Sequence, residues 1–409
     1  MADAVHLRPG LAVRPGEWDP ARMLRRVLVL VAASVVMVGG HVGVVAGVTR
    51  AQVMSRLPRV VSGWSVPLLG LVLLAAGCSS AGQGASAGPQ RHQSLPPDCT
   101  HTITRAADVP VALDTASPGN TVCFSGGDLA DTDVTMTRSG TTAAPIRLVS
   151  DGGTVHSVQI TADHVILEGF TVADGEGVLL RGAGITAGNN TVRDTQRGGV
   201  TCDACTDSTI ESNTIAHVAT AGIWITGQRI TVHANTISGT VPEGDSDADG
   251  MRFFGNGHRI TDNTIFDISA RGYLNPPHPD CFQTYDENSP PTFDVVISGN
   301  TCRNVDAQCL IATGDQHHNS DAPAGIPSIT FVGNTCAANG AQAINLRRWP
   351  NVVIRQDKLG GPNITRGVII IDGSTGATVI GNTTTDGRPT VDIDDSSRQG
   401  SHAEANSPA

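Results

Sequence analysis

One repeat unit of the chain reads Ile210-Glu-Ser-Asn-Thr-Ile215 and continues with Gly222-Ile-Trp-Ile-Thr226. Apolar and polar residues alternate in both segments, which indicates β-strands with one buried face and excludes a helical period. A short unit made of such strands predicts a solenoid in which each turn of the chain stacks on the previous one. The unit recurs from Thr154 onward, and its Asn-Thr pair places asparagines at Asn190, Asn213, Asn235, Asn263, Asn300, Asn334 and Asn382.

An asparagine at the same turn of every coil predicts a ladder, because each amide can hydrogen-bond to the next asparagine and to the backbone. The first two intervals are 23 and 22 residues, and the next three are 28, 37 and 34. The last interval, 48 residues, fits two coils with one asparagine missing near Lys358. A strict short period leaves no pocket, so we expect function on the loops that lengthen the coils between Asn235 and Asn334.

This repeat resembles the pectate-lyase-like right-handed parallel β-helix superfamily over roughly residues 100–390. Two earlier segments, Ala116-Ser-Pro-Gly-Asn-Thr-Val-Cys-Phe124 and Ser139-Gly-Thr-Thr-Ala-Ala-Pro-Ile146, are similar to the opening turns of chondroitinase-B-like and alginate-lyase-like members. The resemblance implies an all-β fold, the right-handed parallel β-helix. It implies little chemistry, because this fold carries lyases, hydrolases, epimerases, adhesins and phage tailspikes.

Composition limits the partners. With 47 glycines and 3% aromatic residues, the chain does not resemble a conventional layered globule, and 16% charged residues argue against a disordered polyelectrolyte. The 38 acidic residues outnumber the 27 basic ones, which gives a formal net charge of −11 and excludes nucleic acid as the expected partner. We expect a monomer whose partner is a polysaccharide substrate or ligand.

The amino-terminal region predicts export. Residues 27–48 form an uncharged apolar run long enough to span a bilayer, and a second run from Val60 ends in Leu74-Ala-Ala-Gly-Cys78. That ending resembles a bacterial lipobox, and Met54-Ser-Arg-Leu-Pro-Arg59 supplies the positive segment that a signal peptide needs. The resemblance implies a lipidated Cys78 and a protein on the outer face of the cell membrane, or a secreted one. The alternative is an anchor at 27–48 followed by an apolar linker.

These features divide the chain into five segments. The first is a leader that is not translated if synthesis starts at Met54, and it is followed by a signal peptide and a flexible linker. The β-helix and a polar, disordered tail complete the chain. In order, the segments are 1–53, 54–77, 78–97, 98–390 and 391–409.

Alignment of the strand after each Asn-Thr pair predicts three columns of side chains on one face of the coil, with successive coils about 4.8 Å apart. The columns are Ala221, Asp249, Asp280, Gln308 and Gln342, then Trp224, Arg252, Gln283, Ile311 and Asn345, then Phe254, Tyr285, Thr313 and Arg347. His278 lies just before the second carboxylate. Such a face is typical of a carbohydrate cleft, and its expected catalytic residues are Asp249, Arg252, His278, Asp280, Gln283, Tyr285 and Arg347.

A cation is a second expectation for this face. Asp245-Ser-Asp-Ala-Asp249-Gly250 resembles the first half of a calcium loop, but Asn256 stands where the final glutamate of an EF-hand would be. We therefore expect either a looser Ca²⁺ site or a polar turn capped by aspartate. The expected metal ligands are Asp247, Asp249 and Asp280.

The cysteines favour disulfides, because an even number remains in an exported chain once Cys78 is set aside. Cys281 and Cys309 share an inward column on adjacent coils, as do Cys302 and Cys336. Because Cα atoms about 5 Å apart fall within bridging range, we expect Cys302 to be bridged to Cys336, with stacked free thiols as the alternative. The eight cysteines are Cys99, Cys123, Cys202, Cys205, Cys281, Cys302, Cys309 and Cys336.

Three functions remain open at this point. A polysaccharide lyase acting on a uronate-containing glycan is favoured, because the opening turns resemble lyases. Since Lys358 is the only lysine, the base would have to be Arg252, Arg347, Tyr285 or His278. A glycoside hydrolase using Asp249 and Asp280 is the second function. A non-catalytic surface module that binds glycan through Trp224 and Tyr285 is the third.

Overall fold

The computed structural model describes residues 94–409, except 127–128, 245, 288, 316–321 and 409. The predicted leader, the signal peptide, Cys78 and most of the linker lie outside the described residues. Within the described part, no helix is long and apolar enough to cross a bilayer.

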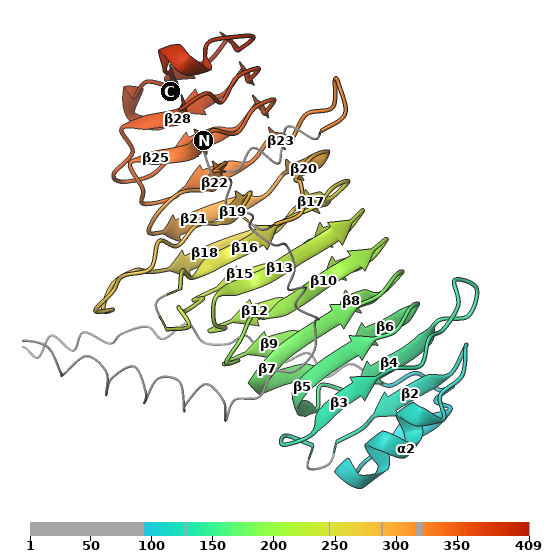
Figure 1. Ribbon diagram of the computed structural model, residues 1–409. Helices are drawn as coiled ribbons and strands as arrows, with labels where there is room; N and C mark the ends of the chain where they lie inside the picture. The colour runs from blue at the N-terminus through green and yellow to red at the C-terminus, as the bar shows by residue number, and fades with distance from the viewer. Residues whose placement is uncertain (1–93, 127–128, 245, 288, 316–321, 409) are drawn as a thin grey trace, which may run out of the picture. The chain divides into compact units, whose positions relative to one another are not determined.

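The described chain is a solenoid with three strands in each full coil, and all strand pairs in its sheets are parallel (Figure 1). One row of strands, the A row, forms a 13-stranded sheet. Its strands are β1 His101–Ile103, β2 Thr121–Phe124, β4 Ile146–Ser150, β6 Val165–Glu168, β8 Thr186–Gly188, β11 Thr209–Glu211, β14 Thr231–His233, β17 Arg259–Thr261, β20 Val295–Ser298, β23 Ile329–Val332, β26 Val353–Arg355, β29 Thr378–Ile380 and β32 His402–Glu404.

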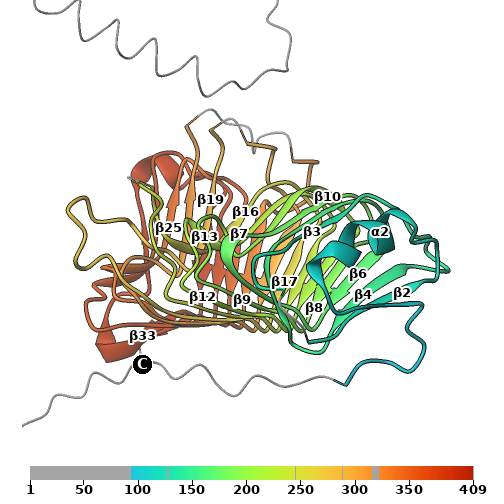
Figure 2. The ribbon, with the colours of Figure 1, turned by 90° about the horizontal axis from the view of Figure 1, so that it is seen from below.

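The other two rows form a 20-stranded sheet. The B row follows the A row in each coil and contains β9 Thr191–Arg193, β12 Thr214–Ala216, β15 Thr236–Ser238, β18 Thr264–Ile268, β21 Thr301–Val305, β24 Thr335–Ala337, β27 Lys358–Gly360, β30 Thr383–Thr384 and β33 Ser407–Pro408. The C row completes the coil with β3 Asp133–Met136, β5 Thr154–Thr161, β7 Thr171–Arg181, β10 Val200–Thr206, β13 Ala221–Gln228, β16 Asp249–Phe253, β19 Phe282–Tyr285, β22 Leu310–Thr313, β25 Gln342–Arg347, β28 Arg366–Ile371 and β31 Val391–Ile393. The long strands β5 and β7 span both rows, because their first residues pair in the B row. Figure 2 shows the three rows on different sides of the coil.

The core is a stack of small aliphatic side chains in the middle of the coil. In the A row, inward-facing register partners follow one another from coil to coil, as in Ile210, Val232, Ile260 and Ile297, all 0% exposed. Burial of each such side chain stabilises the fold by about 1.5–3 kcal/mol. The alternating pattern of the sequence therefore builds a core that needs few aromatic residues.

A short helical cap covers the first coil. The 3₁₀ helix Ala106–Asp108 leads into α2 Val109–Asp114, which buries Val109, Ala112 and Leu113 against the coil interior. Pro110 stands near the start of α2, where a missing N–H costs nothing. Two further 3₁₀ turns, Thr385–Gly387 and Asp395–Ser397, lie in the last coils.

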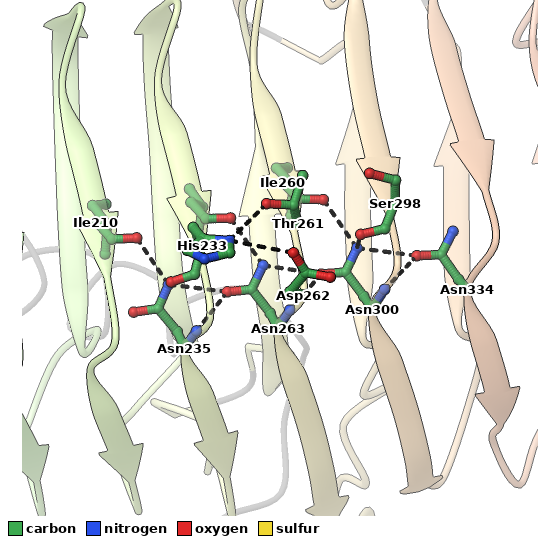
Figure 3. Close-up of polar contacts among 11 residues, drawn as sticks. Ile210, His233, Asn235, Ile260, Thr261, Asp262, Asn263, Ser298, Asn300 and Asn334 are labelled. Carbon is green, nitrogen blue, oxygen red and sulfur yellow. Dashed lines mark hydrogen bonds and ion pairs between the residues drawn. The ribbon is translucent and has the colours of Figure 1, made fainter.

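The predicted asparagine ladder is present (Figure 3). The backbone N–H of Asn263 and its Nδ2 group both donate to Oδ1 of Asn300, at 2.8 and 2.9 Å, and Nδ2 also donates to the carbonyl of Val232 in the preceding coil. The same pattern runs from Asn190 to Asn334. All these asparagines are buried, so the bonds satisfy polar groups that water cannot reach.

The missing asparagine is replaced by an aspartate. Asn334 donates its backbone N–H and Nδ2 to Oδ1 of Asp357 at 2.7 and 3.1 Å, and the N–H of Asp357 donates to Asn382. The ladder then continues to Asn406. Oδ2 of Asp357 is buried without a hydrogen-bond partner, and burial raises the pKa of this carboxyl to about 7.

The carboxyl-terminal segment is part of the coil. β31 pairs with β28, β32 pairs with β29, and β33 pairs with β30, while Val391 and Ile393 pack against the core. The prediction of a disordered tail at 391–409 is therefore wrong for the described residues of that range. Its polar sequence reflects an outermost coil, where most side chains are exposed and strand pairing depends on backbone groups.

All eight predicted cysteines are bridged, but two pairs differ from the prediction. The bonds are Cys99–Cys123, Cys202–Cys205, Cys281–Cys302 and Cys309–Cys336. The predicted Cys302–Cys336 bond is wrong, although these two residues are register partners in β21 and β24.

The geometry of parallel strands explains the difference. Register partners on parallel strands point their Cβ atoms in the same direction and keep them about 4.8 Å apart, whereas a disulfide needs about 3.8 Å. Cys281 lies at the start of the C row of one coil and Cys302 in the B row of the next coil, so they point into the interior from two different rows, with Cα atoms 6.1 Å apart. Cys309 and Cys336 repeat this arrangement one coil later, at 5.8 Å.

Candidate functional site

The predicted columns lie on the outer face of the C row. Register partners link Trp224 to Arg252, Arg252 to Gln283, Gln283 to Ile311 and Ile311 to Asn345. The alignment of the sequence is confirmed for this column, because period-2 alternation and a short turn together set the register of each strand.

Longer connections flank the face where it crosses β16, β19 and β22. On the B-row side these are residues 239–248 and 269–281, and on the A-row side 286–294 and 314–328. The later coils have shorter B-to-C connections, 338–341 for example. The long intervals in the asparagine spacing therefore surround the predicted site, as expected from sequence.

The first element of the site is an ion pair between Asp249 and Arg252. Nε of Arg252 donates to Oδ2 of Asp249 at 2.6 Å, and the carboxylate is fully buried. The Arg252 side chain is itself 9% exposed and packs over the ring of Trp224, 5.1 Å from its centroid. Burial raises the pKa of Asp249 to about 7, and the charge of Arg252 opposes this shift.

The second element is a His278–Asp280 pair from the next coil. Nδ1 of His278 lies 3.1 Å from Oδ2 of Asp280, whose side chain is fully buried while that of His278 is 51% exposed. The hydrogen bond to Asp280 raises the pKa of His278 to about 9, against the opposing effect of burial. Burial raises the pKa of Asp280, and its hydrogen bond with His278 lowers it.

A backbone bond joins the two pairs. The N–H of Asp280 donates to Oδ1 of Asp249 at 2.9 Å, and the N–H of Gln308 donates to Oδ1 of Asp280 at 2.7 Å. The two aspartates thus form a short ladder at the start of the C-row strands, comparable to the asparagine ladder between the A and B rows.

This arrangement changes the roles expected for the carboxylates. Asp249 and Asp280 were expected to be exposed to the cleft, yet all four of their oxygens face protein donors. That expectation is wrong, because the long B-to-C connections bring His278 and its neighbours over the start of the strands. The groups presented to solvent are the histidine and part of the arginine.

The same contacts bear on the expected Ca²⁺ site. Asp247 uses Oδ1 to accept the backbone N–H of His278 at 2.8 Å, and the oxygens of Asp249 and Asp280 are occupied as described. No group of three or more His, Cys, Asp or Glu among the residues described here is arranged to hold a metal ion. In this arrangement the three aspartates do not fit Ca²⁺, and calcium binding stays an untested prediction.

Tyr285 adds a phenol hydroxyl beside Arg252. Its ring meets the buried Phe254 edge-on, 4.8 Å between centroids, and Phe254 in turn lies 5.7 Å from Trp224. Burial raises the pKa of Tyr285 above its usual 10, with Arg252 opposing, so the phenol keeps its proton at neutral pH.

The other predicted residues lie nearby with weaker roles. Gln283 is half-buried next to Arg252 in the column. Arg347 is exposed, two coils beyond Tyr285 in its column, and forms an ion pair with Asp372 at 2.7 Å. The structure therefore groups Asp249, Arg252, His278, Asp280, Gln283 and Tyr285 in two adjacent coils and leaves Arg347 outside that group.

A groove on the same face was not anticipated from sequence. It has a volume of about 390 Å³ and lies over β3, β5, β7 and β10. The column of Trp224 runs into it, because Trp224 is the register partner of Thr201, and the column continues through Leu179, Gln159 and Thr135. The strands β3, β5 and β7 precede the first repeat asparagine, Asn190, so only the alternation of residues 154–161 and 177–181 could have indicated this part of the groove.

Comparisons with known proteins agree with the fold. The family described as "Right handed beta helix region" matches residues 176–322. No curated protein matches the sequence.

Two solved structures share the fold at low identity. An alginate lyase from Paenibacillus sp. str. FPU-7 is 16% identical, with a TM-score of 0.51 over 71% of this chain and 96% of the other. A mutant tailspike protein of E. coli bacteriophage HK620, in complex with a pentasaccharide, is 11% identical, with a TM-score of 0.50 over 74% of this chain and 62% of the tailspike. The matching family model, the parallel coils and the asparagine ladder together show that the chain has the fold of a right-handed parallel β-helix.

Proposed function

We propose that the protein is a carbohydrate-active enzyme, a polysaccharide lyase that acts on a uronate-containing glycan at the outer face of β13, β16, β19 and β22. One observation carries the proposal: two buried carboxylates in adjacent coils hold a largely buried guanidinium and a half-exposed imidazole beside a protonated phenol. Both solved structures named above, a lyase and a sugar-bound tailspike, act on or bind carbohydrate, which supports the substrate class.

The proposed step is a β-elimination. A base removes the proton at C5 of the uronate, the electron pair forms the C4=C5 double bond, and the C4–O bond to the leaving sugar breaks. The leaving oxygen takes a proton from an acid, so the products are a new non-reducing end with a double bond and a sugar with a free hydroxyl. A cation beside the carboxylate stabilises the negative charge that develops when C5 loses its proton.

Each role has a candidate in the described site. Arg252, held by Asp249 and Trp224, is placed to pair with the uronate carboxylate. His278, once deprotonated, is the base, and its pKa of about 9 predicts a rate that rises from neutral to alkaline pH. Tyr285 is the acid, because its raised pKa keeps the proton in place until the leaving oxygen needs it.

For the alternative, a glycoside hydrolase, the site offers no accessible pair of carboxyl groups in Asp249 and Asp280. A retaining or inverting hydrolase needs two carboxyl groups that reach the glycosidic bond. Asp249 and Asp280 are both 0% exposed, and backbone and side-chain donors occupy their oxygens. We therefore do not propose hydrolysis by this pair.

The test uses the purified protein with alginate, pectate, glucuronan and neutral glycans as probes. We expect absorbance of the unsaturated product with at least one uronate-containing glycan. Tyr285→Phe and His278→Ala should each lower kcat by about 100-fold or more, the usual contribution of a general acid or base. His217→Ala is the matched control, because His217 is also exposed and faces an aspartate but lies outside the site.

Two results would end the proposal. New reducing ends without unsaturation would mean a hydrolase that uses other residues. Binding of the glycans without any cleavage would mean a surface binding module.

We propose further that the protein is exported and that Cys78 carries a lipid that tethers it to the outer face of the cell membrane. Four disulfides support an oxidising compartment. The lipobox-like segment at Leu74 supports the anchor.

A further inference from the structure

The groove over β3, β5, β7 and β10 differs from the proposed site in its chemistry. Its lining includes three carboxylates, of Asp133, Glu176 and Asp203, and two guanidiniums, of Arg181 and Arg197. Uncharged polar side chains and one leucine make up much of the remaining outward surface: Thr135, Ser157, Gln159, Leu179 and Thr201.

Every charge named in this lining has a partner of opposite sign. Nε of Arg181 donates to Asp203 at 2.8 Å, and Nε of Arg197 lies 3.4 Å from Glu176. Asp133 pairs with His156, outside the groove, at 2.8 Å, and this hydrogen bond raises the pKa of the histidine. Each guanidinium of the groove is already paired with a carboxylate, so the lining has no excess positive charge to balance an anionic ligand.

The groove and the proposed site form one track. Thr201 is the register partner of Leu179 on one side and of Trp224 on the other, and Trp224 is the partner of Arg252. Successive members of this column lie about 4.8 Å apart, close to the length of one sugar unit in an extended chain. A glycan bound at Arg252 that follows the column therefore passes the half-buried face of Trp224 and enters the groove.

From these contacts we propose that the groove binds uncharged sugar units of the same glycan, so the substrate is a heteropolysaccharide in which uronates are separated by neutral sugars. The inference rests on the proposed lyase function for the uronate at Arg252. Sugar hydroxyls can donate to the carboxylates and accept from the guanidiniums and from Gln159, and the apolar face of a ring packs on Leu179. A run of consecutive uronates would place an unneutralised carboxylate against those of the groove.

Calorimetric titration separates binding from cleavage. The protein carries Tyr285→Phe so that hexasaccharides persist, and the probes are cellohexaose, xylohexaose and mannohexaose against hexagalacturonate and hexamannuronate. We expect at least one neutral probe to bind with a Kd that ionic strength leaves unchanged, because no net charge is involved. Thr201→Tyr fills the groove and should weaken that binding by about tenfold or more while uronate binding stays within about twofold.

Thr236→Tyr is the matched control. Like Thr201, Thr236 is a half-buried threonine that points outward, but it lies on the B row, where its register partners are Thr214 and Thr264. Two further variants each remove one exposed ion pair. Arg181→Ala removes the ion pair with Asp203 in the groove, and its control Arg229→Ala removes the ion pair with Asp207 outside the groove. Only the groove variants should affect the neutral probe.

The outcomes distinguish this inference from the lyase proposal. The groove site is overturned if none of the three neutral probes binds. It is also overturned if Thr201→Tyr and Thr236→Tyr lose the same amount of affinity for the neutral probe. Stronger loss of uronate than of neutral binding in Thr201→Tyr overturns the claim of uncharged units. Neutral binding that depends on Thr201, together with no unsaturated product from any glycan, supports the groove and overturns the lyase proposal alone.

Discussion

The backbone N–H of Asp280 donates to the carboxylate of Asp249, 2.9 Å away in the preceding coil, so the two aspartates follow one another in a ladder and do not face each other across a cleft. Each keeps one oxygen for a cationic side chain, the largely buried Arg252 in one coil and the half-exposed His278 in the next. The carboxylates thus act as positioning residues. Their burial strengthens these pairs, because little water competes for the oxygens.

Asp280→Asn should lower the pKa of His278 from about 9 toward its ordinary 6.5. The amide keeps an acceptor for the N–H of Gln308 but removes the charge that stabilises the imidazolium. Titration of the histidine by NMR measures the shift, and the pH profile of activity should move to lower pH with it. Asp262→Asn is the control, since Asp262 faces the exposed His233 at 3.4 Å. An unchanged His278 pKa would contradict the pairing.

The same bond has a consequence for stability. Because the folded pKa of His278 is raised, its pairing with Asp280 stabilises the wild type fully below about pH 6.5 and loses that contribution as pH rises through about 9. Denaturant unfolding at pH 6 and pH 10 measures the free energy of unfolding of wild type and Asp280→Asn. The difference between the two proteins should be smaller at pH 10 than at pH 6.

Chelation should leave activity unchanged. Arg252 and His278 already occupy the oxygens that Ca²⁺ would need, so neither substrate binding nor the proposed elimination requires a metal at Asp247, Asp249 and Asp280. Dialysis against a chelator, followed by assay with and without added Ca²⁺, checks this. Loss of activity on chelation and recovery with Ca²⁺ would restore the calcium site predicted from sequence.

Asp357→Asn should stabilise the protein at neutral and alkaline pH. The aspartate replaces an asparagine of the ladder and buries an oxygen without a partner, so the folded state favours the protonated acid. Since the folded pKa is raised to about 7, wild type loses stability as pH rises from about 4 through 7. The free energy of unfolding of the variant should exceed that of wild type by nearly zero at pH 4 and by about 1–4 kcal/mol at pH 8.

Denaturant unfolding at the two pH values measures this difference. Asp372→Asn is a control, because that aspartate is an exposed partner of Arg347. A gain that does not depend on pH would contradict the assignment to the buried carboxyl.

Peptide mapping under non-reducing conditions should recover Cys281 linked to Cys302 and Cys309 linked to Cys336. Each bond joins the C row of one coil to the B row of the next, so loss of either pair by serine substitution should lower stability by about 2–4 kcal/mol. A peptide linking Cys302 to Cys336 would contradict the observed pairing and favour the bond along the stack.

Cys78→Ala should release the protein from the membrane fraction if the lipobox-like segment is processed as proposed. Mass spectrometry of the wild type should show the mature chain starting at a lipid-bearing Cys78. A variant that remains in the membrane fraction with unchanged mass would favour the apolar run 27–48 as the anchor.

The coil and its outer face could be predicted because both depend on local information. Alternation of residues such as those in Gly222–Thr226 sets which side chains point inward, and the asparagine at each turn sets the length of the unit. Once the turns were aligned, stacking at a constant spacing placed Trp224, Arg252 and Gln283 in one column, which the register confirms.

The tertiary structure determined the burial of Asp249 and Asp280, the pairing of the cysteines, the last coil and the groove. Each depends on groups distant in sequence: Asp249 accepts the N–H of Asp280, 31 residues later, and Cys281 meets Cys302, 21 residues later, because the C row of one coil converges on the B row of the next. Alternation along a strand distinguishes inside from outside but carries no information about what covers the ends of strands. The chemistry of this face lies mostly at those ends, where contacts between coils decide which polar groups meet water.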